Sequence, residues 1–514
     1  MATANTANEP AGKAGDPSQK SSAATTMFNR ARLLRAIYGG TEPMRELGNE
    51  ILPQYEKESQ TRYEARRNST FSLNKLREAV DAASAKPFKS LVTLRNTTPD
   101  LDLMVKDVDL RGNHLHLFAH RVFNDALLVG QSHILVDHPT TTSMPNLAVQ
   151  KAAGVRPFFK HIKDDQVPAV YSEYVGGDIQ VTHARIRSSR VRRTADFKEE
   201  VINIIYVLEK EIGAAAGIVQ TWEQPAASQG GEWTFIGETP LTVPEVPFVT
   251  LFAGEQESDY VTRPIFYDLA FKQIEHWISS SDQRSILAAG RFPMLAASGV
   301  ELDPEDESGF AIGPYKVLYS PEAGGRWYYV EPNGKAIEAG ARDLEMIELH
   351  MDMMALNPVQ ATHRQYVPQN ERDIQETRVH SVIHDLAMSC RDTLKTAIQF
   401  AGAWTNTDYS AVEVDLDSDF TNTADKQAQI GTLLTAYEKR GISRQTFLTE
   451  AKKLGLVSDD FDIAAELVVL QQADDALAAA AAKPASTLEK PPADATKAPK
   501  VDFPSGQNRP KSQI

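Results

Sequence analysis

The hydrophobic pattern changes its period along the chain, and this change most limits the folds that the sequence can adopt. Before about residue 130 and after about residue 264, apolar residues recur every three or four positions, as they do on one face of a helix. From about residue 155 to 250, short runs rich in β-branched and aromatic residues alternate with turn residues, as in strands. Helices and strands that occupy separate stretches predict an α+β fold.

Glycines mark the ends of the first helices. The helix that begins at Phe28 should end at Gly39-Gly40, and a second helix is predicted from Ser72 to Ala85. A third helix, beginning at Leu115, should end at Gly130, directly before a buried strand over Ser132–Val136. The strands predicted in the middle of the chain are Phe158–Ile162, Val167–Tyr174, Val201–Val207, Ile218–Trp222 and Trp233–Ile236.

Residues 264 to 290 predict one long helix, with Pro264 in its first turn and Gly290 at its end. At 1.5 Å per residue its length is roughly 40 Å. A polar patch, Ser279–Arg284, is expected to contact water or a second copy of the chain. The apolar stripe of this helix consists of Phe266, Leu269, Ile274, Trp277 and Ile278.

A short β section and then several helices complete the prediction. The β section pairs Tyr315–Tyr319 with Trp327–Glu331 across a turn at Pro321–Gly325. The predicted helices are Asp343–Ala355, Glu371–Ala403, Thr423–Lys439, Ser443–Leu454 and Ile463–Gln472. Residues 1–26 and 476–514, rich in Ala, Pro, Ser, Thr and Lys, are expected to be disordered tails.

Composition narrows the function classes. The 514 residues carry a formal net charge of −15, which argues against a protein that grips nucleic acid through a basic face, although an acidic channel wall would let DNA slide past. The single cysteine, Cys390, excludes an intramolecular disulfide and suits a reducing compartment. With no apolar stretch of about 18 residues and no secretory signal, we expect cytosolic synthesis and no membrane span.

Motifs for catalysis are absent or incomplete. Gly334-Lys335 lacks the flanking residues of a phosphate-binding loop, and His380 with His384 has the spacing of a zinc pair but no Glu at position 381. No nucleophile elbow and no dinucleotide fingerprint occurs. Cys390 has helical spacing with Ile383 and Leu394, so it should be a buried small hydrophobe. We therefore predict no catalytic residue, no cofactor and no enzymatic activity.

Two further groups invite a metal-binding interpretation. His116 and His120 share a helix face near His114, but no cysteine is nearby, and the simpler interpretation is that they are ordinary helix residues. The acidic run Asp415–Asp419 lacks the glycine and distal glutamate of a calcium loop, so a solvated strand end is favoured. No metal site is predicted.

One strongly basic run remains as a candidate contact site. It comprises Arg185, Arg187, Arg190, Arg192 and Arg193. These side chains would either meet DNA phosphates or an acidic partner, or belong to a solvated or intersubunit strand. The sequence leaves these alternatives open.

Five segments in order resemble the pattern of tailed-phage portal proteins, the head-to-tail connectors, especially a branch known as a phage domain of unknown function. The segments are Tyr38–Met44 with Ile51–Pro53 and Tyr63–Arg66; Ala126–Gly130 before Ile134–Asp137; Val246–Val249 with Arg263–Ile265 and Ser279–Arg284; Trp327–Glu331 with Gly334; and Trp404, Asp419-Phe420, Gly441–Ser443 and Leu454–Leu456. Together they cover most of residues 27–470.

The resemblance implies an elongated subunit with wing, stem, clip and crown regions. Its implied regions are 27–194 for the N-terminal part of the wing, 195–250 for a β-rich clip, 251–291 for the stem helix, 292–370 for the wing and tunnel loop, and 371–475 for wing-to-crown helices. The tunnel loop is expected within about 292–345.

The resemblance also implies partners and a location. The subunit would form a homo-oligomeric ring of twelve at one capsid vertex of the virion, after synthesis in the host cytoplasm. It would contact the terminase large subunit, head-completion or adaptor and tail proteins, the major capsid and scaffolding proteins, and dsDNA that passes without sequence specificity. The alternatives are another structural virion protein, such as an adaptor or capsid component, and an enzyme of unrecognised type.

Overall fold

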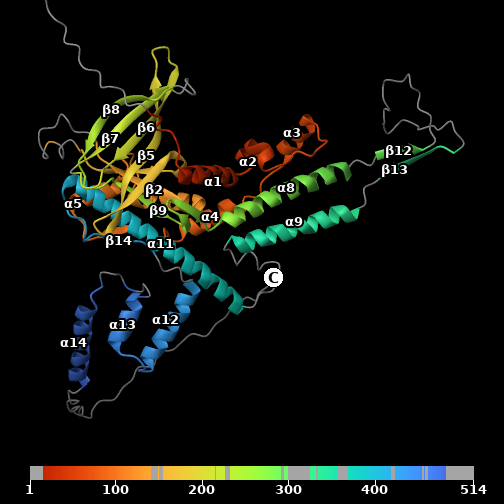
Figure 1. Cartoon of the computed structure of the whole chain (residues 1–514). Helices are drawn as coiled ribbons and strands as arrows, with labels where there is room; N and C mark the ends of the chain where they lie inside the picture. Colours follow the sequence, from red (N-terminus) through yellow and green to blue (C-terminus); the bar gives the residue numbers. More distant parts are fainter. Residues whose placement is uncertain are drawn as a thin grey trace, which may run out of the picture. The chain divides into compact units, whose positions relative to one another are not determined.

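The computed structural model describes residues 15–139, 149, 154–214, 216–225, 232–290, 294–298, 324–330, 334–355, 369–417, 423–453, 457 and 461–481. Helix and sheet are mixed, which confirms the predicted α+β class (Figure 1). The chain divides into two compact units, Met1–Phe420 and Thr421–Ile514. We describe each unit by itself.

Short helices form much of the first unit's core. They are α1 Ser22–Gly39, α2 Thr41–Leu47, η1 Gly48–Glu50, α3 Gln60–Ser69, α4 Lys75–Ala85, α5 Pro99–Lys106 and α6 Leu115–Val129, with η2 Asp164–Gln166 further on. The Ser21 hydroxyl caps α1 by accepting from Ala24 N, and Met27 is fully buried. The predicted disordered tail 1–26 is therefore wrong from Ser21 onward, because alanine and threonine there belong to a capped, packed helix.

Helix α6 and strand β2 (Gln131–Asp137) meet at Gly130, as predicted. Gly130 has φ +109°, and a Cβ there would lie 2.6 Å from the Thr262 carbonyl oxygen. Only glycine fits at position 130, because its backbone is left-handed and the backbone of residues 262–264 packs directly against it. Strand β2 lies between β3 (Phe158–Ile162) and β9 (Phe248–Phe252) in a three-stranded antiparallel sheet.

A five-stranded antiparallel sheet follows the strand pattern of residues 155–250. Its strands, in spatial as well as chain order, are β4 Ala169–Val175, β5 Asp178–Arg193, β6 Glu199–Glu209, β7 Gly217–Pro225 and β8 Thr234–Leu241. The predicted wing–clip boundary at 194/195 falls in the turn between β5 and β6, which pair along eleven positions. The strands on the two sides of this boundary therefore belong to one sheet, and the division into wing and clip regions stays a prediction.

The long helix of the prediction is α8, Tyr267–Gly290, and it begins three residues later than expected. Pro264 instead ends β11 (Val261–Pro264), which pairs with β10 (Gly254–Ser258). Helix α9 (Gly334–Met354) packs against α8, and Figure 1 shows the two running side by side. A Cβ on Gly340 would come within 2.1 Å of Gln283 Oε1, so glycine permits the close approach.

The polar patch on α8 contacts its own chain, which corrects the expectation of water or a second copy. Ser281 and Gln283 are buried, Gln283 Nε2 donates to Ile337 O of α9 at 2.8 Å, and Arg284 donates to Ser69 O of α3 at 3.1 Å. Asp282 accepts from the Tyr55 hydroxyl. Helix α8 is thus bound by polar contacts on both sides.

Between α8 and α9 the chain forms an antiparallel ribbon. Strand β12 (Met294–Ser298) pairs with β13 (Arg326–Val330), with Met294 opposite Val330. The predicted partner of this second strand, Tyr315–Tyr319, lies outside the described residues. Because β12 follows α8 and β13 precedes α9, the ribbon continues from one end of the helix pair.

Helix α11 (Gln369–Thr405) packs into the core of the first unit through Ile383, Cys390 and Leu394. Strand β14 (Glu413–Asp415) then pairs with β1 (Thr93–Arg95). The predicted region 371–475 therefore spans both units, which separate after Phe420. The second unit contains α12 Thr423–Glu438, α13 Arg444–Lys453 and α14 Ile463–Ala481, so the predicted tail 476–514 is wrong as far as Ala481.

Candidate functional site

The five arginines of the basic run all lie on β5, but on both faces of the sheet. Neighbours along a strand point to opposite faces. Arg190 and Arg192 share the face of the buried Ala184 and Ile186, whereas the other three arginines share the face of the buried Ile205 and Val207 on β6. The structure therefore does not bring the run together as one basic patch.

Carboxylates and backbone groups of the chain contact most of these arginines. Arg190 pairs with Glu223 at 3.0 Å and Arg192 with Glu200 at 2.6 Å. Arg185 donates to the Pro17 carbonyl at 3.2 Å. Exposed pairs of this kind weakly neutralise Arg190 and Arg192, and a contact of the run with DNA phosphates or an acidic partner stays a prediction.

The turn between β5 and β6, the hairpin tip, exposes an aromatic residue in an unfavourable backbone conformation. Phe197 has φ +61° and is 79% exposed. The Arg193 guanidinium lies 4.7 Å from its ring centroid, and Val191 and Val201, directly opposite each other, are also exposed. Left-handed backbone and water both disfavour phenylalanine, so this residue weakens the isolated subunit.

The other end of the same sheet carries a shallow hollow with a volume of about 430 Å³. Tyr171, 49% exposed, and Ile212, 56% exposed, contribute apolar surface to it. Glu173, Glu209 and Glu211 surround them. The other lining residues are Thr182, His183 and Lys210.

Two basic side chains, His183 and Lys210, lie among the glutamates of the hollow. Burial, and secondarily the charge of Arg185, lowers the pKa of His183, and its Nδ1 is 4.0 Å from Glu209. The Lys210 ammonium donates to the Pro244 carbonyl. The hollow thus combines apolar side chains with an excess of carboxylates.

A larger groove of about 1280 Å³ separates α3 from the end of α8. Two of its basic side chains have partners within the chain: Arg66 pairs with Glu58 at 2.8 Å, and Arg284 donates to Ser69 O. The groove is open along its length and lined by both charge signs. This arrangement is typical of a surface groove between packed helices and not of a small-molecule site, which is concave and mostly apolar.

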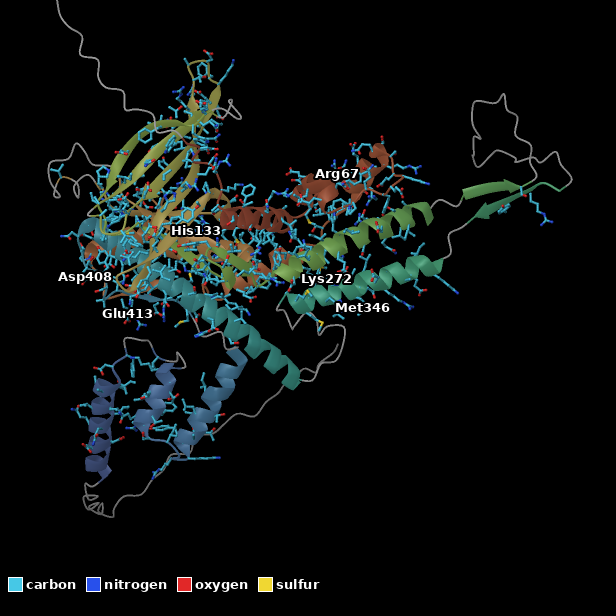
Figure 2. The ribbon with its side chains drawn as sticks, in the orientation of Figure 1. Arg67, His133, Lys272, Met346, Asp408 and Glu413 are labelled. Carbon is cyan, nitrogen blue, oxygen red and sulfur yellow. The ribbon has the colours of Figure 1, made fainter. Side chains whose placement is uncertain are left out.

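Helix α9 has an apolar stripe that is exposed in the described part of the subunit. Ile347 and Met351 are buried, but Met346 and Met353 are 51% and 60% exposed (Figure 2 labels Met346). They are seven residues apart and therefore share one helix face. Exposed methionine suits an adaptable protein contact.

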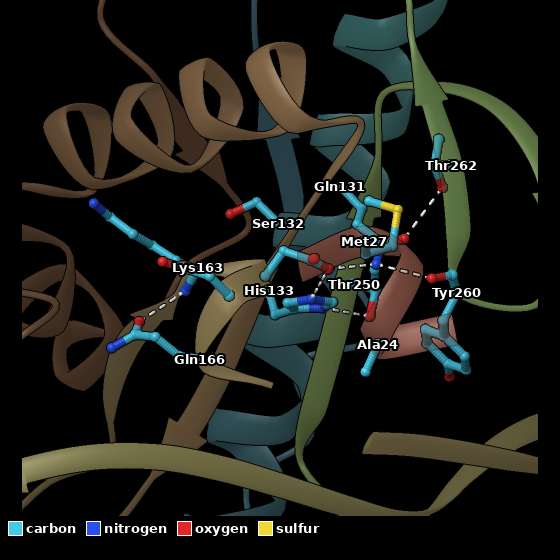
Figure 3. Close-up of polar contacts among 12 residues, drawn as sticks. Ala24, Met27, Gln131, Ser132, His133, Lys163, Gln166, Thr250, Tyr260 and Thr262 are labelled. Atoms are coloured by element: carbon cyan, nitrogen blue, oxygen red, sulfur yellow. Dashed lines mark hydrogen bonds and ion pairs between the residues drawn. The ribbon is translucent and has the colours of Figure 1, made fainter. Parts of the chain in front are cut away.

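A buried polar network joins β2, β9 and η2 (Figure 3). His133 Nδ1 lies 2.9 Å from Thr250 Oγ1, and its Nε2 lies 3.3 Å from Asp164 Oδ1. Gln131 Nε2 donates to Asp164 Oδ1 at 2.5 Å and to Tyr260 O at 3.0 Å. No local sequence pattern indicates this network, because its members look like ordinary strand residues until pairing brings them together.

Asp125 on α6 belongs to a second buried group. Arg35 donates to it at 2.5 and 3.1 Å, and His161 lies 3.5 Å away. Burial by itself would raise the pKa of Asp125, but the contacts with His161 and Arg35 hold it well below its usual range. Both groups fix strands to helices inside the protein, and neither opens onto a groove described above.

The histidines considered for metal binding have structural contacts. His114 caps α6 by accepting from His116 N, and His116 Nδ1 accepts from Val92 N at 3.3 Å. His120 stacks near Phe88, with ring centroids 5.0 Å apart. Burial lowers the pKa of both His116 and His120. Among the described side chains, no three His, Cys, Asp or Glu are grouped as a metal site.

The other sequence candidates have clear positions where the structure describes them. Cys390 is buried in the core, which confirms the prediction, and burial raises its pKa to about 12. Asp415 ends β14 and pairs with Arg95 at 2.7 Å, while Asp419 and the His380 side chain lie outside the described residues. Searching the described helices for a long apolar segment finds none able to cross a membrane.

The described part of the chain is thus a mixed helix and sheet protein whose distinctive surfaces suit protein contacts. A family model described as Domain of unknown function (DUF4055) matches residues 265–405, from the start of α8 to the end of α11. No curated protein matches the chain.

Solved structures to which the chain is similar include chains from gene transfer agent (GTA) particles. A chain from the virion of a native particle is 13% identical, with a TM-score of 0.40, over 80% of this chain and 98% of that chain. A chain from the neck of an empty particle, computed with C6 symmetry, is 11% identical with a TM-score of 0.38, over 74% and 89%. A neck chain computed with C12 symmetry is 12% identical with a TM-score of 0.38, over 74% and 88%.

Proposed function

We propose that this chain is the portal subunit of a tailed phage or phage-like particle, which forms a ring around a dsDNA channel at one capsid vertex. The observation that carries the proposal is the antiparallel pair α8–α9 with the β12–β13 ribbon at its end. Each side of such a helix pair offers a long face to a neighbouring subunit. The ribbon at its end offers a surface to which another protein can bind. The ordered sequence resemblance supports the same function.

The uncovered stripe on α9 explains why the subunit would assemble. Met346 and Met353 remain half-exposed although Ile347 and Met351 on the same helix are buried. A neighbouring copy would cover this stripe with a different part of its own helix pair. A head-to-tail contact rotates each subunit by a fixed angle relative to its neighbour. The subunits close into a ring when a whole number of these rotations makes 360°.

The structure changes which residues we assign to each proposed region. Residues 195–250 contribute β6–β8 to a sheet of the main unit, so they are poor candidates for a separate clip. We assign the stem to α8 and α9 together, and the docking end for terminase, adaptor and tail proteins to β12–β13. The crown is assigned to the second unit, residues 421–514.

The proposed ring acts as a conduit and supplies no chemical energy. Terminase would hydrolyse ATP, while the ring holds it in place and guides the duplex. The net charge of −15 favours sliding, because an acidic wall repels phosphates and reduces sequence-independent adhesion. Binding of the major capsid and scaffolding proteins would anchor the ring in the shell.

Mass measurement of the purified full-length chain tests the proposal. A ring of twelve would have a mass close to twelve times 56.7 kDa and a central hole in electron micrographs. Packaging of dsDNA by the partner terminase should then require the ring. A chain that stays monomeric at micromolar concentration, or forms only small oligomers without a hole, would overturn the proposal.

A further inference from the structure

The two ends of the five-stranded sheet have complementary surfaces. The hairpin tip carries Phe197 with Arg193 against its ring, and the hollow combines Tyr171 and Ile212 with three glutamates. We propose that the hairpin tip of one subunit inserts into the hollow of a second copy of the chain. This contact rests on the proposed ring function and identifies a specific joint within the ring.

The backbone of Phe197 is the first reason for this inference. Thr194 N donates to Lys198 O at 2.9 Å, and Phe197 N donates to Thr194 O at 3.2 Å, which closes the turn with Phe197 in the left-handed conformation. Glycine or asparagine is the usual residue there. An exposed phenylalanine at such a position lowers both stability and solubility, so an occupied binding site accounts for it better than the fold does.

The hollow has the chemistry that this tip requires. An aromatic ring with a guanidinium beside it needs apolar contact and a nearby negative charge. Tyr171 and Ile212 provide apolar surface, and Glu173, Glu209 and Glu211 provide carboxylates. A volume of about 430 Å³ accommodates one aromatic side chain and part of an arginine.

The distance along the sheet requires a second copy. Strand β5 runs from the hollow, at His183, to the tip, at Arg193. Ten residues of strand extend roughly 33 Å at about 3.3 Å per residue. A subunit therefore cannot fill its own hollow. Because the two surfaces differ, the contact is heterologous, as a closed ring needs.

The key variant is Phe197→Gly, which separates assembly from folding. Glycine relieves the left-handed strain, so the subunit should unfold at the same or a higher denaturant concentration. Assembly should nevertheless weaken, with roughly a thirtyfold rise in the half-assembly concentration, as for loss of a central aromatic contact. Ile236→Ser is the control, since it removes another exposed apolar residue, from β8, and should leave assembly unchanged.

Mixing two variants tests the direction of the contact. The tip variant is Phe197→Gly, and the hollow variant combines Tyr171→Ser with Ile212→Ser. At a concentration below both variants' raised half-assembly concentrations, neither should form rings alone. A mixture should give pairs of two chains by mass photometry, because one intact tip meets one intact hollow. Arg193→Glu should likewise weaken rings, and Glu209→Arg in the same chain should restore them.

The outcomes separate this inference from the proposed function. If the wild-type chain forms rings and Phe197→Gly forms them at the same concentration, the tip contact is wrong while the ring function stands. If the wild-type chain forms no ring, both are overturned. Pairs in the mixture, absent from each variant alone, would establish the contact.

Discussion

Asp125 shows how much one buried carboxylate can contribute to the fold. It is 6% exposed and accepts from Arg35 and Ser132 while lying beside His161. Asp125→Asn should lower the free energy of unfolding by about 3–5 kcal/mol, because Arg35 would lose its partner in a low-dielectric site. Urea denaturation followed by circular dichroism measures the change. Asp165→Asn is the control, as Asp165 lies 3.8 Å from Arg35 and is more exposed.

The same carboxylate predicts a pH dependence of stability. The pKa of Asp125 is lower in the folded chain than in the unfolded one, so its contribution is present above the unfolded value of about 4 and is lost as pH falls toward the folded value. The midpoint of urea denaturation should therefore fall below about pH 4 in the wild type. Asp125→Asn should lose part of this dependence. An unchanged pH profile in the variant would count against the assignment.

Cys390 offers a probe of the core, since it is the chain's only cysteine. Burial raises its pKa to about 12, and only the thiolate reacts readily. The native chain should therefore react with a thiol reagent at pH 8 far more slowly than the chain in guanidinium chloride. If Cys390 in the native chain reacted as fast as an exposed thiol, this result would contradict the described packing of α11.

At the residue scale, the sequence predicted the positions of single residues but not the contacts between side chains that lie far apart in the chain. Helical spacing placed Cys390 inside, and Gly130 was recognised at its helix end. The contacts of His133 with Thr250 and Asp164 depend on strand pairing. No local pattern encodes that pairing, so these contacts could not be predicted. The separation of the arginines onto two faces follows from alternation along β5, a strand that was not among those predicted.

The junction of α6 and β2 allows a prediction at the scale of elements. Gly130→Ala should destabilise the chain by roughly 2–4 kcal/mol, through left-handed strain and collision with the Thr262 carbonyl. Gly112→Ala isolates the strain, because Gly112 also has positive φ but no atom lies within 4 Å of its added Cβ. That control should lose only about 1 kcal/mol. Equal losses in thermal or urea unfolding would contradict the close approach.

Most helices could be predicted because their ends carry local signals. Gly39-Gly40, Gly130 and Ser443 each mark a boundary that the structure retains to within one residue. Pro264 misled the prediction, since proline fits a strand end as well as a first helical turn. The short strands β10, β11 and β12 were missed because each is stabilised by its partner rather than by its own pattern.

The whole molecule should associate through α9 if the ring proposal holds. Met346→Glu together with Met353→Glu places charge on the exposed stripe, which should weaken assembly while leaving subunit unfolding unchanged within about 0.5 kcal/mol. Leu103→Glu on α5 is a control with a similarly exposed apolar residue. Sedimentation velocity reports the assembly state. Intact rings in the double variant would exclude this stripe from the interface.

The ribbon between α8 and α9 affects how the sequence of such a protein can change in evolution. The chain leaves through β12 and returns through β13, with Met294 directly opposite Val330. The segment between the two strands begins and ends beside the pair Ser298 and Arg326. The entropy of closing this loop therefore changes only slowly with its length. Evolution can therefore lengthen, shorten or replace that insert while α8 and α9 keep their packing.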